Sequence, residues 1–161
     1  MYNCLIAICK LFIYKLFMSK QTKKHLGGCP VAYGTDIFGD RWTLLVIRDM
    51  ILHGKKRYGD LLDAEEKIAT NILADRLTHL EAAGVVNKAQ DPENRRSYIY
   101  SLTQKGLALT PIILEIVRWS GSHLKMNKSR RELLKRIDTD RNNLIAEIYA
   151  RENKSLPKLA I

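Results

Sequence analysis

Apolar side chains recur every three or four positions through the middle of the chain, which is the spacing of a helix that buries one face. This pattern predicts four helices, at residues 31–38, 41–53, 58–64 and 69–83. Asp40 precedes the second helix and suits the capping of its first turn. Gly54 and Gly84 follow the second and fourth helices, where a glycine commonly ends a helix.

The spacing changes from 3.6 to 2 after the fourth helix, which indicates strands. Strands are predicted at residues 85–90 and 97–102, and the second is rich in β-forming side chains. The polar stretch Asp91–Arg96 between them is typical of a turn. These two strands therefore form a hairpin whose tip carries basic residues.

Helical spacing returns after the hairpin. A helix is predicted at residues 104–123, with Thr103 as its cap and with a kink or break at Pro111. A last helix is predicted at about residues 129–151.

The order of these elements predicts a mainly α fold with a small β-hairpin (α+β): a winged helix-turn-helix with additional C-terminal helices. We divide the chain accordingly into an apolar N-terminal extension of open origin at 1–18, a basic flexible segment at 19–28, a winged helix-turn-helix DNA-binding domain at 29–123, and a C-terminal helical extension at 124–161, with dimerisation as its candidate role.

The first eighteen residues are strongly apolar, but Lys10 and Lys15 interrupt them. A membrane-spanning helix needs about 20 apolar residues with few charges, and neither a basic start nor a small-residue cleavage site marks a signal peptide. Three interpretations stay open: translation that begins at Met18, a peripheral amphipathic helix, or a helix packed on the domain. We expect a cytoplasmic protein without a membrane partner.

Composition adds a preference for polyanions. The formal net charge is +10, which attracts nucleic acid or other acidic partners. The three cysteines are an odd number without a C-x-x-C pair, so reduced thiols are expected. The four histidines are scattered, and no phosphate-binding glycine motif or nucleophile–base pair is present. We therefore expect no metal, no cofactor and no enzymatic activity.

The chemistry of the candidate site is that of DNA recognition. An α-helix fits the major groove, and its outward side chains meet base edges. In the helix 69–83 the outward positions are Thr70, Asn71, Ala74, Asp75 and Thr78. Arg95 and Arg96 at the hairpin tip suit phosphate or the minor groove.

Two groups of charged residues leave an alternative open. The basic run Lys55, Lys56 and Arg57 suits a grip on the DNA backbone, and its alternative is a solvated loop. Arg76 suits either a phosphate contact or a structural salt bridge with Asp49 or Glu81.

Four stretches resemble the HxlR-type family of regulators: CPVAYGTDIFGDRWTLLVIRDM, KRYGDLL, LADRLTHLEAAGVV and RRSYIYSLTQKG. The resemblance covers residues 29–123. It implies a winged-helix homodimer that binds a two-fold DNA operator and controls transcription, sometimes under chemical signals. One departure is Ala69, where the family usually has a capping serine. Either Thr70 takes that role or the start of the helix frays.

The resemblance also draws attention to Cys29, because several relatives sense oxidants or electrophiles with a cysteine at this position. The alternative is a small buried side chain in the first turn of a helix. A dimer surface is expected where the last helices carry more apolar residues than the motif covers. The candidate interface residues are Ile113, Ile116, Val117 and Trp119.

The sequence thus predicts a sequence-specific DNA-binding regulator that acts as a homodimer. Cys29 is its candidate site of thiol control. The alternative is a winged-helix module that binds protein or RNA and no operator.

Overall fold

The computed structural model describes residues 28–125 and 127–153. The chain divides into two units, residues 1–37 and residues 38–161. The sequence predictions for residues 1–18, and for nearly all of 19–28, lie outside the described residues. In the first unit α2 (Pro30–Phe38) begins at a proline, which suits the first turn because its nitrogen needs no helical partner there.

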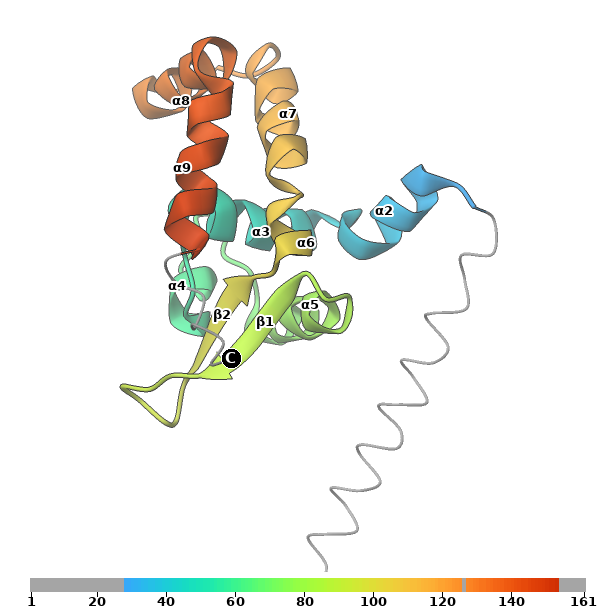
Figure 1. Ribbon diagram of the computed structural model, residues 1–161, viewed down its shortest axis with the longest axis vertical. Coiled ribbons are helices and arrows are strands. Elements are labelled where there is room, and N and C mark those ends of the chain that lie inside the picture. The colour runs from blue at the N-terminus through green and yellow to red at the C-terminus, as the bar shows by residue number, and fades with distance from the viewer. Residues whose placement is uncertain (1–27, 126, 154–161) are drawn as a thin grey trace, which may run out of the picture. The chain divides into compact units, whose positions relative to one another are not determined.

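The second unit contains the remaining described elements (Figure 1). In chain order they are α3 (Arg41–His53), α4 (Tyr58–Leu62), α5 (Thr70–Ala82), β1 (Val86–Gln90), β2 (Tyr98–Leu102), α6 (Gln104–Leu107), α7 (Thr110–Gly121), α8 (Lys128–Thr139) and α9 (Arg141–Asn153). The fold is mainly helical with one antiparallel hairpin, as the sequence predicts.

The central helix is α3, and its bounds are those predicted from the sequence. Asp40 caps it, because the carboxylate accepts hydrogen bonds from the backbone N–H groups of Trp42 at 3.0 Å and Thr43 at 3.1 Å. Gly54 ends it in the left-handed conformation, at φ 66°. The buried side of α3 packs against α5 and α7, so this helix is the support for the rest of the unit.

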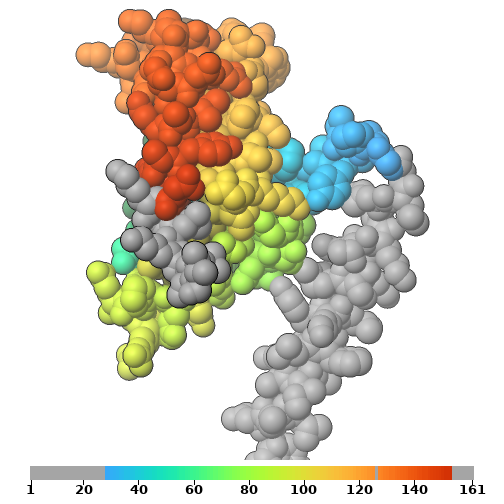
Figure 2. Space-filling model, in the orientation of Figure 1, coloured from blue at the N-terminus to red at the C-terminus, as the bar shows by residue number. Residues whose placement is uncertain are grey.

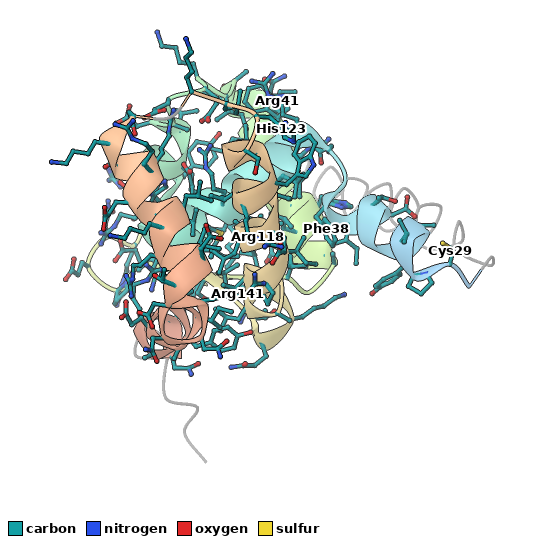
Figure 3. The ribbon with its side chains drawn as sticks, turned by 90° about the horizontal axis from the view of Figure 1, so that it is seen from above. Cys29, Phe38, Arg41, Arg118, His123 and Arg141 are labelled. Carbon is teal, nitrogen blue, oxygen red and sulfur yellow. The ribbon has the colours of Figure 1, made fainter. Side chains whose placement is uncertain are left out.

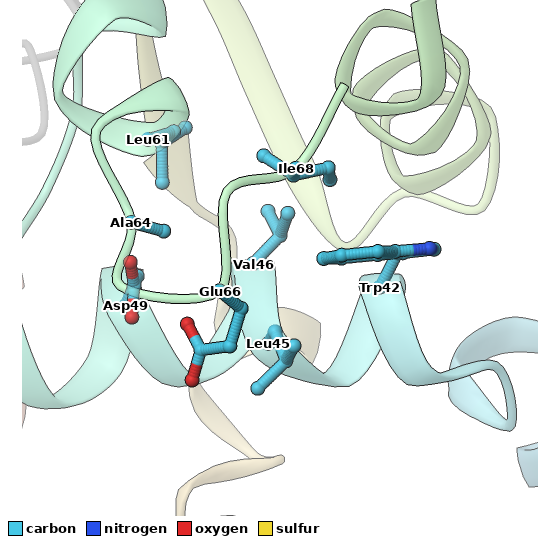
Figure 4. A pocket seen from close by; sticks show the side chains of 8 residues that line it. All are labelled: Trp42, Leu45, Val46, Asp49, Leu61, Ala64, Glu66 and Ile68. Atoms are coloured by element: carbon cyan, nitrogen blue, oxygen red, sulfur yellow. The ribbon is translucent and has the colours of Figure 1, made fainter. Parts of the chain in front are cut away.

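The chain between α4 and α5 closes over α3. The helix α4 ends at Leu62, two residues earlier than predicted, and Lys67 takes a positive φ of 52° in the following turn. This turn places Ile68 in the core at 6% exposure. A cavity of about 10 Å³ remains beneath the loop, with Trp42 toward one end and Asp49 and Glu66 toward the other (Figure 4). Such a space is no larger than one water molecule.

The hairpin has a third partner that the sequence pattern does not predict. Its register pairs Val86 with Leu102, and β1 and β2 each begin one residue later than expected. On the other edge of β2, the backbone N–H of Tyr100 donates to the carbonyl of Lys56 at 2.8 Å. Beside it, the backbone of Arg57 forms an antiparallel β-bridge with that of Ile99. The basic run before α4 is therefore joined to the sheet.

The predicted helix 104–123 is two helices. Thr103 caps α6 by accepting from the backbone N–H of Gly106 at 3.1 Å, as predicted. The chain then breaks at Ala108 and Leu109, so Pro111 lies in the first turn of α7. A proline in that position costs no backbone hydrogen bond, so the break precedes the proline instead of centring on it.

The predicted helix 129–151 is also two helices, and the sequence prediction is wrong here. Asp140 leaves the helical conformation, at φ −144° and ψ 34°, and its carboxylate accepts from Asn143 Nδ2 at 2.6 Å. The chain folds back, and Arg136 of α8 pairs with Glu147 of α9 at 2.7 Å. No glycine or proline marks this reversal, so the apolar period alone does not reveal it.

The last helix, α9, runs beside α7 (Figure 1). Near its start Arg141 pairs with Glu115 of α7. Further along, the Tyr149 hydroxyl donates to the carbonyl of Leu107 at 3.0 Å. The helix α9 is therefore packed against the preceding helices of its unit.

Candidate nucleic-acid interface

The helix α5 has one anchored face and one open face. Its anchored face is Leu73, Leu77 and Leu80, each at most 2% exposed. Burying a leucine fully is worth about 1.5–3 kcal/mol, so this face fixes the rotation of the helix. The open face contains all five positions predicted to meet DNA: Thr70, Asn71, Ala74 and Asp75 are exposed, and Thr78 is half-buried.

The start of α5 has no side-chain cap. Ala69 is the residue at the cap position, and Thr70 is the first residue of the helix. The first helical hydrogen bond runs from the backbone N–H of Leu73 to the carbonyl of Ala69 at 2.9 Å. Thr70 does not take the role of a capping residue; its carbonyl instead accepts from the Tyr58 hydroxyl at 2.7 Å. This bond ties the start of α5 to α4.

Arg76 is held in a salt bridge, but not with the residues predicted. Its guanidinium lies 3.1 Å from Asp40 and 2.5 Å from Asp75. The first contact joins α5 to the cap of α3. The second places a positive charge beside Asp75 on the open face, which reduces the repulsion between this carboxylate and a phosphate.

The hairpin tip presents two arginines. Arg95 and Arg96 are exposed, and the tip projects from its unit (Figure 2). The backbone beneath them is organised, because Gln90 Nε2 donates to the carbonyl of Arg95 at 2.6 Å and Asn94 Oδ1 accepts from the N–H of Arg96 at 3.1 Å. Within the described residues neither guanidinium forms a salt bridge.

The basic run before α4 is different, because all three of its side chains have acidic partners. Lys55 Nζ lies 2.8 Å from Asp49, Lys56 Nζ lies 3.3 Å from Glu152, and Arg57 Nη2 lies 3.1 Å from Asp91. The three carboxylate side chains are only 2–3% exposed. A buried carboxylate requires a partner, so these cations have a structural task that the sequence pattern did not reveal.

The partners come from three different elements. Asp49 belongs to α3, Glu152 to α9, and Asp91 to the hairpin turn. They are 6, 96 and 34 positions from the cations with which they pair. The two longer separations lie beyond the reach of any local sequence pattern, so spacing along the chain does not reveal these contacts.

The helix α7 carries an exposed apolar stripe. Ile112, Ile116 and Trp119 are 39%, 42% and 70% exposed, and their spacing places them on one face. The Trp119 ring lies 4.9 Å from the ring of His123. Among the predicted interface residues, Val117 is half-buried. The prediction for Ile113 is wrong, because this side chain is 4% exposed and is packed inside the unit.

Cys29 is an exposed free thiol immediately before α2 (Figure 3). The alternative expectation, a buried thiol in the first turn, is therefore wrong. Among the described residues no cluster of ligand side chains suits a metal ion. In the same ranges no helix has the length and apolar character needed to cross a membrane.

Comparisons with known proteins connect this geometry to a family. A model of the HxlR-like helix-turn-helix family matches residues 37–128. The HTH-type transcriptional regulator sll1512 of Synechocystis is 31% identical over 106 residues, which are 66% of this chain and 78% of that protein.

Solved structures agree with this match. PA1607, a putative transcription factor, is 33% identical with a TM-score of 0.58, over 64% of this chain and 70% of that one. The redox regulator HypR in its oxidized form is 31% identical with a TM-score of 0.55, over 61% of this chain and all of that one. Because the family match covers more than half of the chain, this protein belongs to the HxlR-like helix-turn-helix family and is a transcriptional regulator of the helix-turn-helix type.

Proposed function

We propose that this regulator binds a two-fold operator in double-stranded DNA as a homodimer, in the cytoplasm. The open face of α5 enters the major groove, and the hairpin (residues 90–97) contacts the DNA backbone or the minor groove. The observation that carries the proposal is the combination of an exposed polar face on an anchored helix with two exposed arginines at the hairpin tip, whose guanidinium groups form no salt bridge with another described residue.

The direct contacts divide by task. Thr70, Asn71, Ala74, Asp75 and Thr78 face bases, and Arg95 and Arg96 face phosphates or the minor groove. Lys55, Lys56 and Arg57 strengthen the local positive potential, but their salt bridges with buried carboxylates reduce what each adds to phosphate binding.

The apolar stripe on α7 supports the proposed homodimer. Contiguous exposed apolar residues usually mark an interface, and two-fold dimers are the most common oligomers. The interface then includes Ile112, Ile116, Val117 and Trp119, with Ile112 in the place predicted for Ile113. Two copies of α5 would meet successive major grooves, about 34 Å apart.

The test is selection of bound fragments from the organism's genomic DNA, followed by titration of the best fragment at several salt concentrations. Arg95→Ala should weaken binding to all duplexes and lower the slope of log K against log salt by about 1. Asn71→Ala should instead change which sequences are preferred. Arg131→Ala, which removes an exposed cation from α8, is the matched charge control. If no duplex is bound better than random DNA, the fold serves as a protein- or RNA-binding module.

Thiol control through Cys29 is a part of the proposal with separate support. The thiol is exposed immediately before the first turn of α2, where an oxidant can reach it, and the related HypR is a redox regulator. Diamide should change the operator affinity of the wild-type protein and of a Cys4→Ser, Cys9→Ser variant, but not that of Cys29→Ser. An equal response of all three proteins would rule this control out.

A further inference from the structure

Asp91, the first residue of the hairpin turn, is a buried carboxylate with several hydrogen bonds. It is 1% exposed. Its Oδ1 accepts from the backbone N–H of Glu93 at 2.9 Å, and its Oδ2 accepts from Ser97 Oγ at 3.3 Å. Its own N–H donates to the carbonyl of Ser97 at 3.0 Å. These bonds fold the turn that carries Arg95 and Arg96.

One further bond to Asp91 comes from outside the hairpin. Arg57 Nε donates to Asp91 Oδ2 at 3.1 Å, across 34 positions of sequence. Arg57 is the residue immediately before α4, and its backbone already pairs with Ile99 of β2. Its guanidinium also lies 3.5 Å from Glu93. The arginine therefore links the helix-turn-helix to the turn of the hairpin.

The tip itself, residues 92–96, is exposed. A hollow of about 530 Å³ lies between α4 and the hairpin, lined by Arg57, Tyr58, Asp60, Asp91, Arg96 and Tyr98 among others. Among the described residues, the contacts that hold the turn on this side are its own hydrogen bonds and the contact between Arg57 and Asp91. A bond of this kind between charged groups, one of them buried, is stronger than a neutral one.

We propose that Arg57 and Asp91 are positioning residues, which hold the hairpin so that Arg95 and Arg96 reach the DNA. This inference rests on the proposed function. It gives Arg57 a role other than the phosphate contact expected from the basic run. It also gives the acidic Asp91 a favourable role in binding a polyanion.

The sign of the effect distinguishes positioning from simple electrostatics. A carboxylate near DNA repels phosphates, so its neutralisation should raise affinity if charge alone matters. If Asp91 positions the tip, its neutralisation releases the turn and lowers affinity. The glutamate two positions later is a matched control, because Glu93→Gln also removes one negative charge near Arg57 from a side chain that is 84% exposed.

The experiment measures operator affinity and the salt dependence for Asp91→Asn and Glu93→Gln. Asp91→Asn should lower affinity about tenfold and reduce the salt slope, because the two tip arginines lose their contacts. Glu93→Gln should leave affinity unchanged or raise it. Arg57→Gln should behave like Asp91→Asn, and Arg57→Lys should recover part of the affinity. A rise in affinity for Asp91→Asn like that for Glu93→Gln would overturn the proposal.

A second measurement does not depend on DNA. Trypsin cuts after arginine, so the rate of cleavage after Arg95 and Arg96 reports how firmly the turn is held. Asp91→Asn should accelerate this cleavage several-fold relative to Glu93→Gln, with the melting temperature of each variant measured alongside. Ser97→Ala removes one hydrogen bond to the same carboxylate and should accelerate the cleavage less. This variant replaces Asp91→Asn in the test if Asp91→Asn does not fold. If the wild-type protein binds no DNA, the proposed function fails. Equal cleavage rates for Asp91→Asn and Glu93→Gln would independently refute the positioning role of Arg57 and Asp91.

Discussion

Arg48 and Glu66 form an ion pair in which both side chains are mostly buried. Arg48 Nη1 lies 2.6 Å from Glu66 Oε1, and Arg48 Nη2 donates to Glu66 Oε2 at 3.0 Å. The hydrogen bonds with Arg48 lower the pKa of Glu66 from 4.5 to about 2. This pair ties the loop before α5 to α3, so the position of this loop depends on an ionised carboxylate.

The free energy of unfolding should therefore decrease as the pH falls in the acid range. Glu66 binds a proton near pH 4.5 in the unfolded chain and near pH 2 in the folded one. Its contribution is complete above about pH 4.5 and is lost as the pH falls toward 2. The loss is on the order of 1 kcal/mol, because part of the pair faces water. Urea unfolding at a series of pH values should show a smaller acid dependence for Glu66→Gln, whereas Glu65→Gln, at a side chain 79% exposed, should match the wild type.

At the scale of elements, the helix α5 is strongly anchored along its length but weakly at its start. Leucines bury one face, whereas Ala69 satisfies none of the free N–H groups of the first turn. Its backbone is extended, at φ −71° and ψ 146°, which is the conformation of a normal capping residue. A serine therefore fits this position without a change of backbone.

The variant Ala69→Ser should stabilise the protein by about 0.5–1 kcal/mol, because the serine oxygen accepts from an N–H in the first turn. Urea unfolding provides the measurement. Ala69→Gly separates capping from backbone preference, because glycine supplies no side-chain acceptor and should give a smaller gain. A loss of stability on Ala69→Ser would show that the first turn is already satisfied by another partner.

At the scale of the whole molecule, the C-terminal extension belongs to the support of the domain. Most of it lies beyond residue 128, where the family match ends. Arg151 nevertheless donates to the carbonyls of Met50 and Ile51 at the end of α3. Glu152, 2% exposed, pairs with Lys56 beside the hairpin. Among the described residues, α8 and α9 thus pack against α7 and leave the stripe around Trp119 exposed.

Trp119→Glu should convert the proposed dimer into a monomer at micromolar concentration, because it places a charge in the apolar interface. Sedimentation velocity measures the change. Lys135→Glu introduces the same side chain at an exposed position of α8 and should leave the dimer intact. A wild-type monomer at this concentration would contradict the dimer itself.

Local patterns in the sequence determined most of the elements. The α3 helix lies between Asp40 and Gly54, whose side chain and left-handed backbone act within one turn. The open face of α5 follows from the spacing of its leucines, and the exposed tip arginines follow from a polar turn between strands. Such features depend on neighbours a few positions away, so the chain itself encodes them without reference to the fold.

Tertiary structure decided which charged side chains pair with one another and which apolar side chains stay on the surface. The carboxylates that hold Lys56 and Arg57 come from distant positions, and burial determines that they must pair. Burial also distinguished Ile113 inside the unit from Ile112 on its surface, and packing against α7 reversed the chain at Asp140 without a glycine or proline. Short-range periodicity does not predict these outcomes, because partners far apart in sequence meet only when the helices pack.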